Sequence, residues 1–390
     1  MSKIAIVAVG YNRPDAMSRL LTSLANADYF GDTVDLLISI DKGPRQEEIV
    51  KLAQDFNWGF GEKNIRVFTE KQGLRNHILQ CGDVSKDYMA VVVLEDDLTV
   101  AKNYYNYVRS CVSFYGNDDK IAGISLYKHC FNVDAGAFFE PVFDGSDVYL
   151  MQYAQSWGQC WTSGMWKDFR EWYNKNEGLF DTAENKRWLD FPHNITTWNK
   201  QSWLKYYIAY VIENNLFYVY PHASLTTDHS EAGEHSQFPS SDFQVALPQG
   251  TFEYRLKKSD ELVKYDAFFE RMNLEIQSFE GKKVVLDLYG RKRKFDNADI
   301  LISMAIHPFK VLHEWKLKLR PQEMNCLEPE NGKGIYVYDL HENDDSKKTA
   351  TDAVRIRYDV RAISYKKLLK LGIVEFKQSL KNKIKKLVKR

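Results

Sequence analysis

Hydrophobic and polar residues are grouped in blocks along the first 130 residues, and the period of the pattern changes from block to block. Short runs of consecutive apolar residues, typical of buried strands, alternate with segments that have an apolar residue every three or four positions, typical of helices. Strands are predicted at Lys3–Val9, Asp35–Ile40, Ile65–Phe68, Tyr88–Leu94 and Ile121–Leu126. Helices are predicted at Asp15–Ala27, Gln46–Phe56, Leu74–Cys81 and Lys102–Tyr115. The alternation predicts an α/β fold with a mainly parallel, doubly wound sheet, in which ligands bind beyond the carboxyl ends of the strands.

The remainder of the chain differs in composition and in the pattern of its predicted elements. Residues 131–250 are dense in aromatic side chains and long loops, and we expect them to belong with residues 1–130 in one domain, 1–250. Residues 251–350 are predicted to form an α+β extension and connector, with a hairpin-like segment at Lys282–Tyr289 and a loose acidic stretch at 321–350. Residues 351–390 are predicted to form a basic amphipathic C-terminal helix.

The C-terminal pattern is the most regular in the chain. Apolar residues recur at steps of three and four and are flanked by lysines; they are Tyr365, Leu369, Ile373, Phe376, Leu380, Ile384 and Leu387. Such a helix is typical of segments that lie on an anionic membrane surface. Docking on the acidic remainder of the chain, or on a partner protein, is the alternative. Nucleic acid is not an expected partner, because the lysines lie opposite an apolar stripe that must also be buried.

The charge balance supports this division of the chain. The formal net charge is zero, with 53 Lys and Arg against 53 Asp and Glu. Residues 361–390 nevertheless contain eleven basic residues and one acid, so they carry +10 and residues 1–360 carry −10. An asymmetry of this size between segments indicates that they face different partners.

Composition excludes several classes of protein. A hydrophobic content of 44% and a charged content of 27% are ordinary for globular chains and unlike disordered, collagen-like or polytopic membrane proteins. No apolar run approaches the ~18 residues of a membrane span, and Ile4–Val9 is too short for a secretory signal. The five cysteines have no CxxC spacing, which argues against a zinc or disulfide framework and for a reducing compartment. We expect a cytoplasmic protein, peripheral at the inner face of the cell membrane.

The strongest candidate for a functional site follows the most apolar strand. Val91–Leu94 leads directly into three consecutive acids, Glu95, Asp96 and Asp97. Adjacent carboxylates repel one another and are costly to bury, so a divalent cation is the natural compensating charge. One or two carboxylates together with substrate phosphates is a usual way for Mg²⁺ or Mn²⁺ to bind a nucleotide. A solvated acidic turn after a core strand is the alternative.

The order of these motifs resembles that of GT-A-fold glycosyltransferases. The resemblance rests on Ala5–Pro14, Asp41, the Gly73-Leu74-Arg75-Asn76 stretch, and Leu94–Asp97 with the following Leu98–Tyr105. It is closest to the N-acetylglucosaminyltransferase I type, whose acidic motif also reads Glu-Asp-Asp, and bacterial polysaccharide sugar transferases look similar. The resemblance covers roughly residues 1–235 and is most specific around 88–107. It implies a GT-A-like catalytic domain with a donor-nucleotide half at 1–130 and an acceptor half at 131–250.

The resemblance also implies roles for individual residues around a UDP- or GDP-sugar donor. By motif position, Asp97 looks like the direct metal ligand, and Glu95 and Asp96 look like contacts to the ribose or sugar of the donor. Asp41 would lie near the base or ribose, and Arg75 near the diphosphate, which a guanidinium pairs with bidentately. Asp41 as a turn former and Arg75 as a surface helix residue are the alternatives.

Three further segments carry candidates. Trp157 and Gly158 are expected to line the donor-sugar and acceptor cleft, although Trp157 and Trp161, four residues apart, would also suit a core stripe. His229 and His235 lie in a polar loop that could complete the metal or diphosphate shell, or be merely a surface loop. Inverting relatives use a carboxylate base, but Thr197–Trp203 has no acid; Asp190 is the nearest substitute, unless it is a helix cap.

These observations predict a metal-dependent glycosyltransferase, moving a hexosyl or N-acetylhexosaminyl group from a nucleotide-diphosphate sugar. The acceptor would be a glycan or lipid-linked oligosaccharide in cell-surface polysaccharide synthesis. A sugar-phosphate nucleotidyltransferase is the alternative enzyme, but the loop Val9–Pro14 is poorer in glycine than such enzymes require. A non-catalytic, membrane-peripheral glycan-binding module also stays open because the base acid is missing. No GxGxxG motif follows any strand, which disfavours a Rossmann oxidoreductase.

Overall fold

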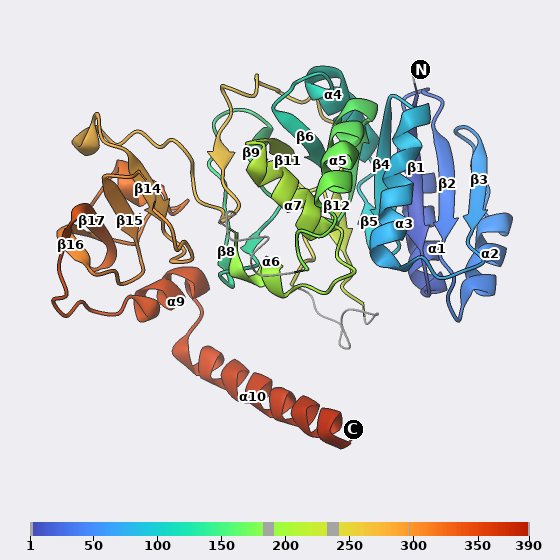
Figure 1. Cartoon of the computed structure of the whole chain (residues 1–390). Coiled ribbons are helices and arrows are strands. Elements are labelled where there is room, and N and C mark those ends of the chain that lie inside the picture. Colours follow the sequence, from blue (N-terminus) through green and yellow to red (C-terminus); the bar gives the residue numbers. More distant parts are fainter. Residues whose placement is uncertain (1–2, 182–190, 232–241, 296, 389–390) are drawn as a thin grey trace.

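The computed structural model describes residues 3–181, 191–231, 242–295 and 297–388. Figure 1 shows a large α/β unit built on one sheet, a smaller unit with a second sheet, and a long C-terminal helix that projects from the smaller unit. The acidic motif lies in the large unit, near the middle of its sheet.

A nine-stranded sheet forms the large unit, in the order β13-β9-β11-β6-β10-β4-β1-β2-β3. Its strands are β1 (Ile4–Gly10), β2 (Asp35–Ile40), β3 (Lys63–Val67), β4 (Ala90–Glu95), β6 (Ile121–Ser125), β9 (Val148–Met151), β10 (Gln159–Thr162), β11 (Phe217–Pro221) and β13 (Lys264–Tyr265). Five of the eight pairings are parallel, so the predicted mixed α/β class with a mainly parallel sheet is confirmed. β10 runs antiparallel to both its neighbours, β4 and β6. One sheet therefore joins the predicted halves, and β13 extends it past residue 250.

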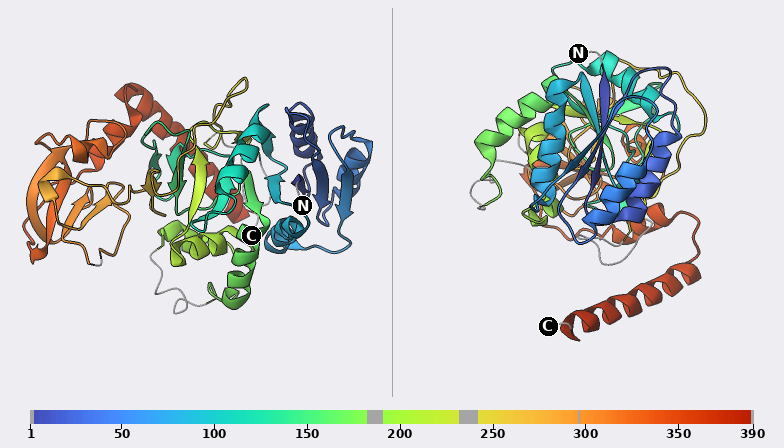
Figure 2. Two further views of the ribbon diagram at one scale, coloured as in Figure 1. Left: turned by 90° about the horizontal axis from the view of Figure 1, so that it is seen from above. Right: turned by 90° about the vertical axis from the view of Figure 1, so that its right-hand side faces the viewer.

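Helices cover both faces of this sheet. They are α1 (Pro14–Ala25), α2 (Gln46–Asp55), α3 (Gly73–Gly82), α4 (Tyr104–Tyr115), α5 (Ser163–Asn176), α6 (His193–Thr197), α7 (Leu204–Glu213) and the 3₁₀ helix η1 (Asp83–Asp87). Figure 2 shows α1 and α2 on one side of the sheet and α3 and α5 on the other. Every residue of β1 is buried, as are the first five of β4, because strands covered on both faces need apolar side chains in both directions.

Two short two-stranded ribbons accompany the large sheet. β5 (Leu98–Val100) pairs antiparallel with β12 (Thr226–Asp228), and β7 (Phe131–Asn132) pairs with β8 (Ala137–Phe138). The ribbon of β5 and β12 matters for the site, because it brings the loop that begins at Asp228 to the acidic motif that follows β4.

The smaller unit has its own sheet and its own core. Its elements are β14 (Val284–Asp287), β15 (Ile300–Ser303), β16 (Phe309–Lys316), β17 (Gly334–Asn343), α8 (Met324–Leu327), α9 (Asp352–Val360) and the 3₁₀ helix η3 (Gln277–Phe279). The strands are ordered β14-β15-β17-β16. The apolar side chains of Ile302, Trp315 and Val337 are buried in one cluster, against which α9 packs Val354 and Tyr358.

Two predictions in this region were wrong. Lys282–Tyr289 is not a hairpin, because β14 within it pairs parallel with β15 and the connection crosses over instead of turning back. Residues 321–350 are not a loose connector, because they contain β17, the partner of both β15 and β16. The acidic composition after residue 338 obscured a strand whose residues 335–338 are buried on both faces, between two apolar clusters.

The C-terminal segment forms two helices where one was predicted. α9 ends at Val360, Arg361 has a positive φ of 54°, and α10 (Tyr365–Val388) begins after a short bend. Positive φ is costly for a residue with a side chain and is incompatible with a continuous right-handed helix. α10 projects away from the rest of the chain in Figure 1 and in the right-hand view of Figure 2. Within the part of the chain that the structure describes, no helix has the length and apolar content needed to span a bilayer.

Candidate active site at the carboxyl end of strand β4

The site begins where β4 leaves the sheet. Glu95 is the last residue of β4, and Asp96 and Asp97 form the tight turn that leads into β5. The antiparallel pairing of β5 with β12 sets Asp228 opposite Leu98, next to the acidic turn. The backbone N–H of His229 donates to the carbonyl oxygen of Asp97 at 3.0 Å, which fixes the two loops together. Four carboxyl groups from distant parts of the sequence thus converge on one edge of the sheet.

Arg13, from the loop between β1 and α1, compensates part of this negative charge. Its guanidinium forms ion pairs with Asp96 and, at 2.9 Å, with Asp97. Burial opposes the charge of Arg13, but the two carboxylates outweigh it and raise its pKa above the ordinary value. Pro14 at the first turn of α1 fixes the backbone just after Arg13, so the guanidinium is directed to the acids by a rigid loop.

One guanidinium does not balance the cluster. Burial raises the pKa of Asp96 to about 6, against the attraction of Arg13. Burial and the neighbouring charge of Asp97 raise the pKa of Asp228 to about 6 as well. The pKa of Glu95 is raised well above its usual range by burial, then by Asp97 and Asp96. The cluster therefore carries more negative charge than its surroundings stabilise, which is the condition that favours a bound cation.

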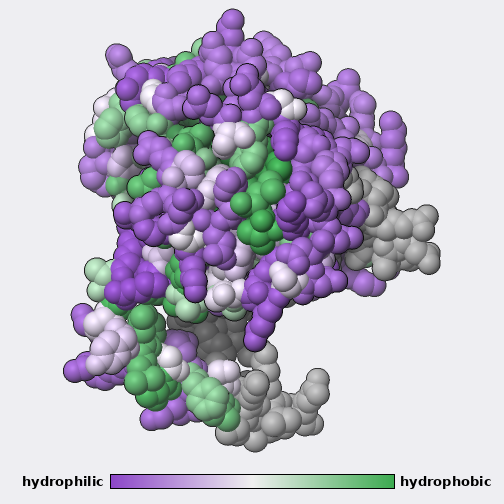
Figure 3. Space-filling model, turned by 90° about the vertical axis from the view of Figure 1, so that its left-hand side faces the viewer, coloured by the Kyte–Doolittle hydropathy of each residue, from purple (hydrophilic) through white to green (hydrophobic). Residues whose placement is uncertain are grey.

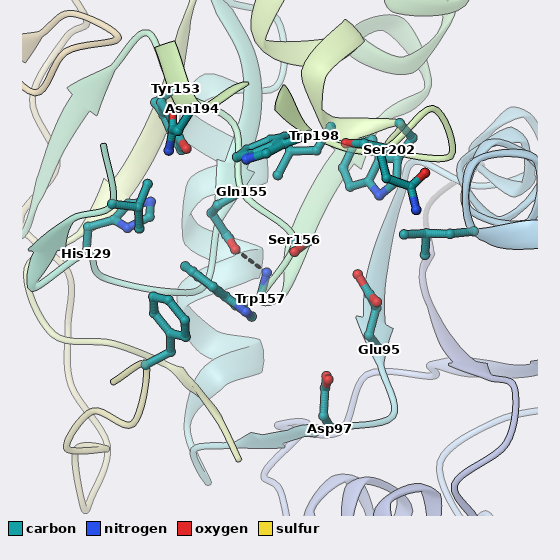
Figure 4. Close-up of a pocket in the computed structure, with 16 residues that line it drawn as sticks. Glu95, Asp97, His129, Tyr153, Gln155, Ser156, Trp157, Asn194, Trp198 and Ser202 are labelled. Carbon is teal, nitrogen blue, oxygen red and sulfur yellow. Dashed lines mark hydrogen bonds between the residues drawn. The ribbon is translucent and has the colours of Figure 1, made fainter. Parts of the chain in front are cut away.

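Two of these acids, Glu95 and Asp97, line a cavity of about 650 Å³. Aromatic and amide side chains form most of its wall, and the polar members include Glu95, Asp97, His129, Gln155, Asn194 and Asn199. Figure 4 shows Glu95 and Asp97 at one end, His129, Tyr153 and Asn194 at the other, and Trp157 between them. The cavity has the size and the mainly apolar lining, with a few polar groups, of small-molecule sites.

The far end of the cavity holds polar atoms that the protein leaves without partners. The side chain of His129 is 2% exposed, and neither its Nε2 atom nor the Oδ1 atom of Asn194 has a hydrogen-bond partner among the residues that the structure describes. Burial among aromatic rings lowers the pKa of His129 to about 3, so its imidazole is neutral. Buried polar atoms without partners are costly, and those that line a cavity are available to a ligand.

The loop Gln155–Gly158 shapes the middle of the cavity. Gln155 donates to the carbonyl oxygen of Gly158 at 2.7 Å and accepts from the N–H of Trp157, the bond drawn in Figure 4. Gly158 has a φ of 91°, and a Cβ atom there would lie 2.8 Å from Thr226 Cγ2 and 3.1 Å from Leu94 Cδ2. Only glycine fits, and its absence of a side chain lets β12 approach the end of β4.

The two tryptophans of this segment have different positions. Trp157 lines the cavity and stacks on Phe243, with ring centroids 4.5 Å apart. Trp161 is fully buried and donates from its indole N–H to the Tyr218 hydroxyl at 2.7 Å. Trp157 therefore lines a cavity and Trp161 belongs to the core, because β10 begins between them and turns Trp161 inward. The contact of Trp157 with a donor sugar or an acceptor remains a prediction.

Asp41 and Arg75 make contacts within the protein that the sequence did not indicate. The Asp41 carboxylate accepts from the backbone N–H groups of Lys42, Gln72 and Gly73, at 2.8, 2.8 and 3.0 Å, and so fixes the start of α3. Arg75 donates to the Tyr206 hydroxyl at 3.0 Å. Leu74, one residue before it, lines the cavity, but Arg75 itself does not. Their donor-binding roles remain predictions.

The histidine and base candidates are placed only in part. His229 is half-buried beside Asp97, but its Nε2 atom is bonded to the Thr99 hydroxyl at 2.8 Å, and burial lowers its pKa. Asp190 and His235 lie outside the described residues. Of the predicted residues, the structure therefore places Glu95, Asp97 and Trp157 in the lining of one cavity, with Asp96, Gly158 and His229 in the adjoining turns and loops.

Comparisons with known proteins give distant similarities. Neither the models of protein families nor the curated proteins yielded a match. Among solved structures, a mannosyltransferase from Pyrobaculum calidifontis in complex with GDP-Man and Mn²⁺ is 12% identical, with 44% of this chain and 46% of that chain covered and a TM-score of 0.31. S. aureus TarS is 13% identical, with 57% and 36% covered and a TM-score of 0.35. TarS 1–349 in complex with UDP is 12% identical, with 57% and 59% covered and a TM-score of 0.34.

The similar region thus spans less than two thirds of each of those chains.

The residues of the acidic cluster fit a hard divalent cation such as Mn²⁺ or Mg²⁺. Their oxygen donors and incompletely compensated charge match what such a cation requires. Within residues 3–181, 191–231, 242–295 and 297–388, no three His, Cys, Asp or Glu side chains are already arranged around a metal position. A cation held by one or two carboxylates and by substrate phosphates does not need such an arrangement. Asp97, whose side chain is 21% exposed and faces the cavity, is the residue we expect to hold it.

Sequence analysis did not single out four residues of this site: Arg13, His129, Asn194 and Asp228. Asp228 stands directly before His229 in the polar segment that carries the histidine candidates, and this position was the available signal. Arg13 carried a weaker signal, as the only cation in the loop after the first strand. Nothing local distinguishes His129 or Asn194, because their burial against the cavity depends on contacts between distant segments.

Proposed function

We propose that this protein is a metal-dependent glycosyltransferase that moves a sugar from a nucleotide-diphosphate donor to a glycan or lipid-linked oligosaccharide. The observation that carries the proposal is the pairing of two features in one cavity. Carboxyl groups with incompletely compensated charge lie at one end, and aromatic rings with unpaired polar atoms form the other. The first suits a cation and a diphosphate, and the second suits a sugar, whose CH faces pack on rings while its hydroxyls take hydrogen bonds.

The chain's own residues would divide the work between binding and charge stabilisation. When bound at Asp97, a divalent cation supplies positive charge to the diphosphate of the donor. During transfer the bond between the anomeric carbon and the diphosphate oxygen breaks, a bond to the acceptor oxygen forms, and the nucleoside diphosphate leaves with the electron pair. Arg13 lies beside Asp97 and can pair with a phosphate bidentately, which would stabilise that negative charge.

The far end of the cavity would orient the sugars. Trp157 offers a ring face, and His129 Nε2 and Asn194 Oδ1 offer the unpaired atoms that hydroxyl groups could satisfy. Asp190 remains the proposed base that removes the proton of the acceptor hydroxyl. A lipid-linked acceptor would place the protein at the cytoplasmic face of the membrane.

The proposal is tested by donor hydrolysis, which needs no knowledge of the acceptor. Purified protein is incubated with a panel of UDP- and GDP-sugars, with Mn²⁺ and with a chelator, and release of the nucleoside diphosphate is measured. We expect release for one donor with Mn²⁺ only, and its loss in Asp97→Asn. Asp119→Asn, which changes an exposed carboxylate elsewhere in the same unit, is the matched control.

Ligand-induced stabilisation supplies an independent readout. Nucleoside diphosphate with Mn²⁺ should raise the melting temperature of the unmodified protein and of Asp119→Asn by mass action, and Asp97→Asn should lose this shift. If no nucleotide produced either hydrolysis or a shift, the glycosyltransferase proposal would be refuted. Release of pyrophosphate from a nucleoside triphosphate and a sugar phosphate would point instead to a nucleotidyltransferase.

A further inference from the structure

A second cavity lies in the smaller unit, at the junction of α9 with the loop that follows β16. It is an open groove of about 720 Å³, and we name it the α9 groove. Four of its eight lining residues are cationic, namely Lys318, Arg320, Arg357 and Arg361, and none is acidic. The remaining wall is apolar or aromatic. A hollow with several cations and no acid in its lining favours an anionic group.

Two of these cations have no carboxylate partner among the described residues. Arg320 lies over the ring of Tyr358, 4.0 Å from its centroid, and donates to the carbonyl oxygen of that residue. Arg357 donates one N–H to the carbonyl oxygen of Ile363 at 3.1 Å. A guanidinium carries five N–H donors, so both retain donors for a phosphate.

The other two cations form ion pairs that leave them available. Lys318 pairs with Glu330 at 3.1 Å and Arg361 with Glu140 at 3.5 Å. All four of these side chains are exposed, and exposed ion pairs contribute little free energy. A phosphate could therefore exchange for either carboxylate at small cost.

The groove leads directly into α10. Arg361 lines the groove, and four residues later α10 begins with Tyr365. The apolar stripe of the helix is open to solvent: Tyr365, Leu369 and Phe376 are 73%, 65% and 68% exposed. Figure 3 shows hydrophobic side chains along this projecting segment, below the body of the molecule. Because these side chains are exposed, the stripe is not docked on the acidic part of the chain that the structure describes.

The pattern of charge around the stripe indicates what covers it. Lys366, Lys370, Lys377 and Lys381 lie on the same helix, and residues 361–390 carry a net charge of +10. A second copy of so basic a helix would be repelled. Nucleic acid would pair with the lysines but leave the apolar stripe in water, which is unfavourable. An anionic lipid surface suits both the stripe and the lysines, because acyl chains contact the apolar side chains while the headgroups pair with the lysines.

We propose that the α9 groove and α10 together form a binding surface for anionic phospholipid. α10 lies in the plane of the interface, and the α9 groove holds the phosphate of one headgroup between Arg320 and Arg357. This surface is separate from the cavity at β4, and the inference holds whether or not the protein transfers a sugar. The reaction would gain from it only if the acceptor is itself anchored in the lipid.

The test is co-sedimentation of the full-length protein with vesicles of phosphatidylcholine, with or without phosphatidylglycerol. Binding is expected only with phosphatidylglycerol, and it should weaken as salt rises. Phe376→Ser is expected to weaken binding at least about tenfold by removing apolar area. Arg357→Gln is expected to weaken it about fivefold, the effect of about 1 kcal/mol for one basic residue near the surface. Arg293→Gln, which removes an exposed charge outside the groove, is the control and should bind as well as the unmodified protein.

The proposal is overturned if the unmodified protein does not bind vesicles that contain phosphatidylglycerol better than vesicles without it. It is also overturned if Phe376→Ser binds as well as the control Arg293→Gln. Phe376 is 68% exposed, so Phe376→Ser is not expected to unfold the body. Equal binding of Arg357→Gln and Arg293→Gln would show that the α9 groove is not part of the lipid-binding surface. If inorganic phosphate stabilised the protein through Arg357 while vesicle binding was unaffected by that residue, the groove would belong to a soluble phosphate and the lipid assignment would be wrong. Self-association abolished by Phe376→Ser, without vesicle binding, would assign the stripe to a second copy.

Discussion

Gly158 offers the sharpest test of how the site is assembled. The substitution Gly158→Ala adds one methyl group where the backbone has a φ of 91° and where Thr226 Cγ2 would lie 2.8 Å away. Thr226 cannot withdraw easily, because its hydroxyl donates to the carbonyl oxygen of Trp157 at 2.5 Å. The strand β12 must therefore shift, and with it Asp228, two residues further along.

The expected cost has two parts. An L-residue at positive φ costs about 1–2 kcal/mol, and forcing a methyl group into a filled space costs about 1–3 kcal/mol more. We therefore expect Gly158→Ala to lose about 2–5 kcal/mol of stability. Gly145→Ala is the matched control, because Gly145 has a φ of 90° and its added Cβ would meet nothing within 4 Å. It should lose only the backbone part, about 1–2 kcal/mol.

Urea unfolding followed by tryptophan fluorescence measures both variants, since every tryptophan except Trp315 lies before residue 251. The displacement of Asp228 should also lower the affinity for nucleoside diphosphate with Mn²⁺ about tenfold in Gly158→Ala, which is 1.4 kcal/mol, and leave Gly145→Ala unchanged. Equal destabilisation of the two variants would refute the steric argument. A destabilised Gly158→Ala with full affinity would show that β12 does not position the acidic cluster.

Three further predictions concern charge in the cavity. Arg13→Ala leaves Asp96 and Asp97 without their guanidinium, so we expect a loss of about 2 kcal/mol in stability that saturating Mn²⁺ restores; thermal denaturation with and without Mn²⁺ measures this, and an equal loss in both conditions would contradict it. The pKa of His129 is lowered from 6.5 to about 3, so the unfolded chain takes up its proton first as the pH falls. The free energy of unfolding is therefore unaffected by His129 above about pH 6.5, and protonation of the unfolded chain at this residue lowers it by about 2 kcal/mol by about pH 5. His129→Phe should remove that part of the acid sensitivity, and identical pH profiles of stability for the two proteins would refute the assignment. Asp228→Asn should weaken binding of Mn²⁺ with nucleotide in calorimetric titration, because it removes one charge of the cluster; unchanged affinity would exclude Asp228 from the cation site.

The sequence predicted the parts of the fold that have a local signal. The alternating strands and helices of the first 130 residues lie within a few residues of the predicted bounds, because each element buries its own apolar face. The strands β10, β12 and β17 were not predicted. β10 and β12 are three or four residues long and derive their pairing from partners far away in the sequence, so neither has a period that can be read locally.

The candidate site divides in the same way. Glu95, Asp96 and Asp97 are consecutive and follow a strongly apolar strand, so the local sequence is enough to identify them. Arg13 and Asp228 join them only because β1 lies beside β4 and β12 lies beside β5. Asp41 shows the opposite case. Its position after a strand predicted a ligand contact, which remains a prediction, whereas its three backbone hydrogen bonds show that it fixes the start of a helix.

The antiparallel strand β10 has a consequence for the order in which the chain is made. β4 is paired with β1 on one side, but its other side is covered only by residues 159–162, which leave the ribosome more than sixty positions later. Until then the growing chain presents Ala90–Leu94 as an open, uncharged edge, the kind that recruits strands from other molecules. A fragment that stops after α4 should therefore precipitate, whereas one that continues past Thr162 has closed this edge.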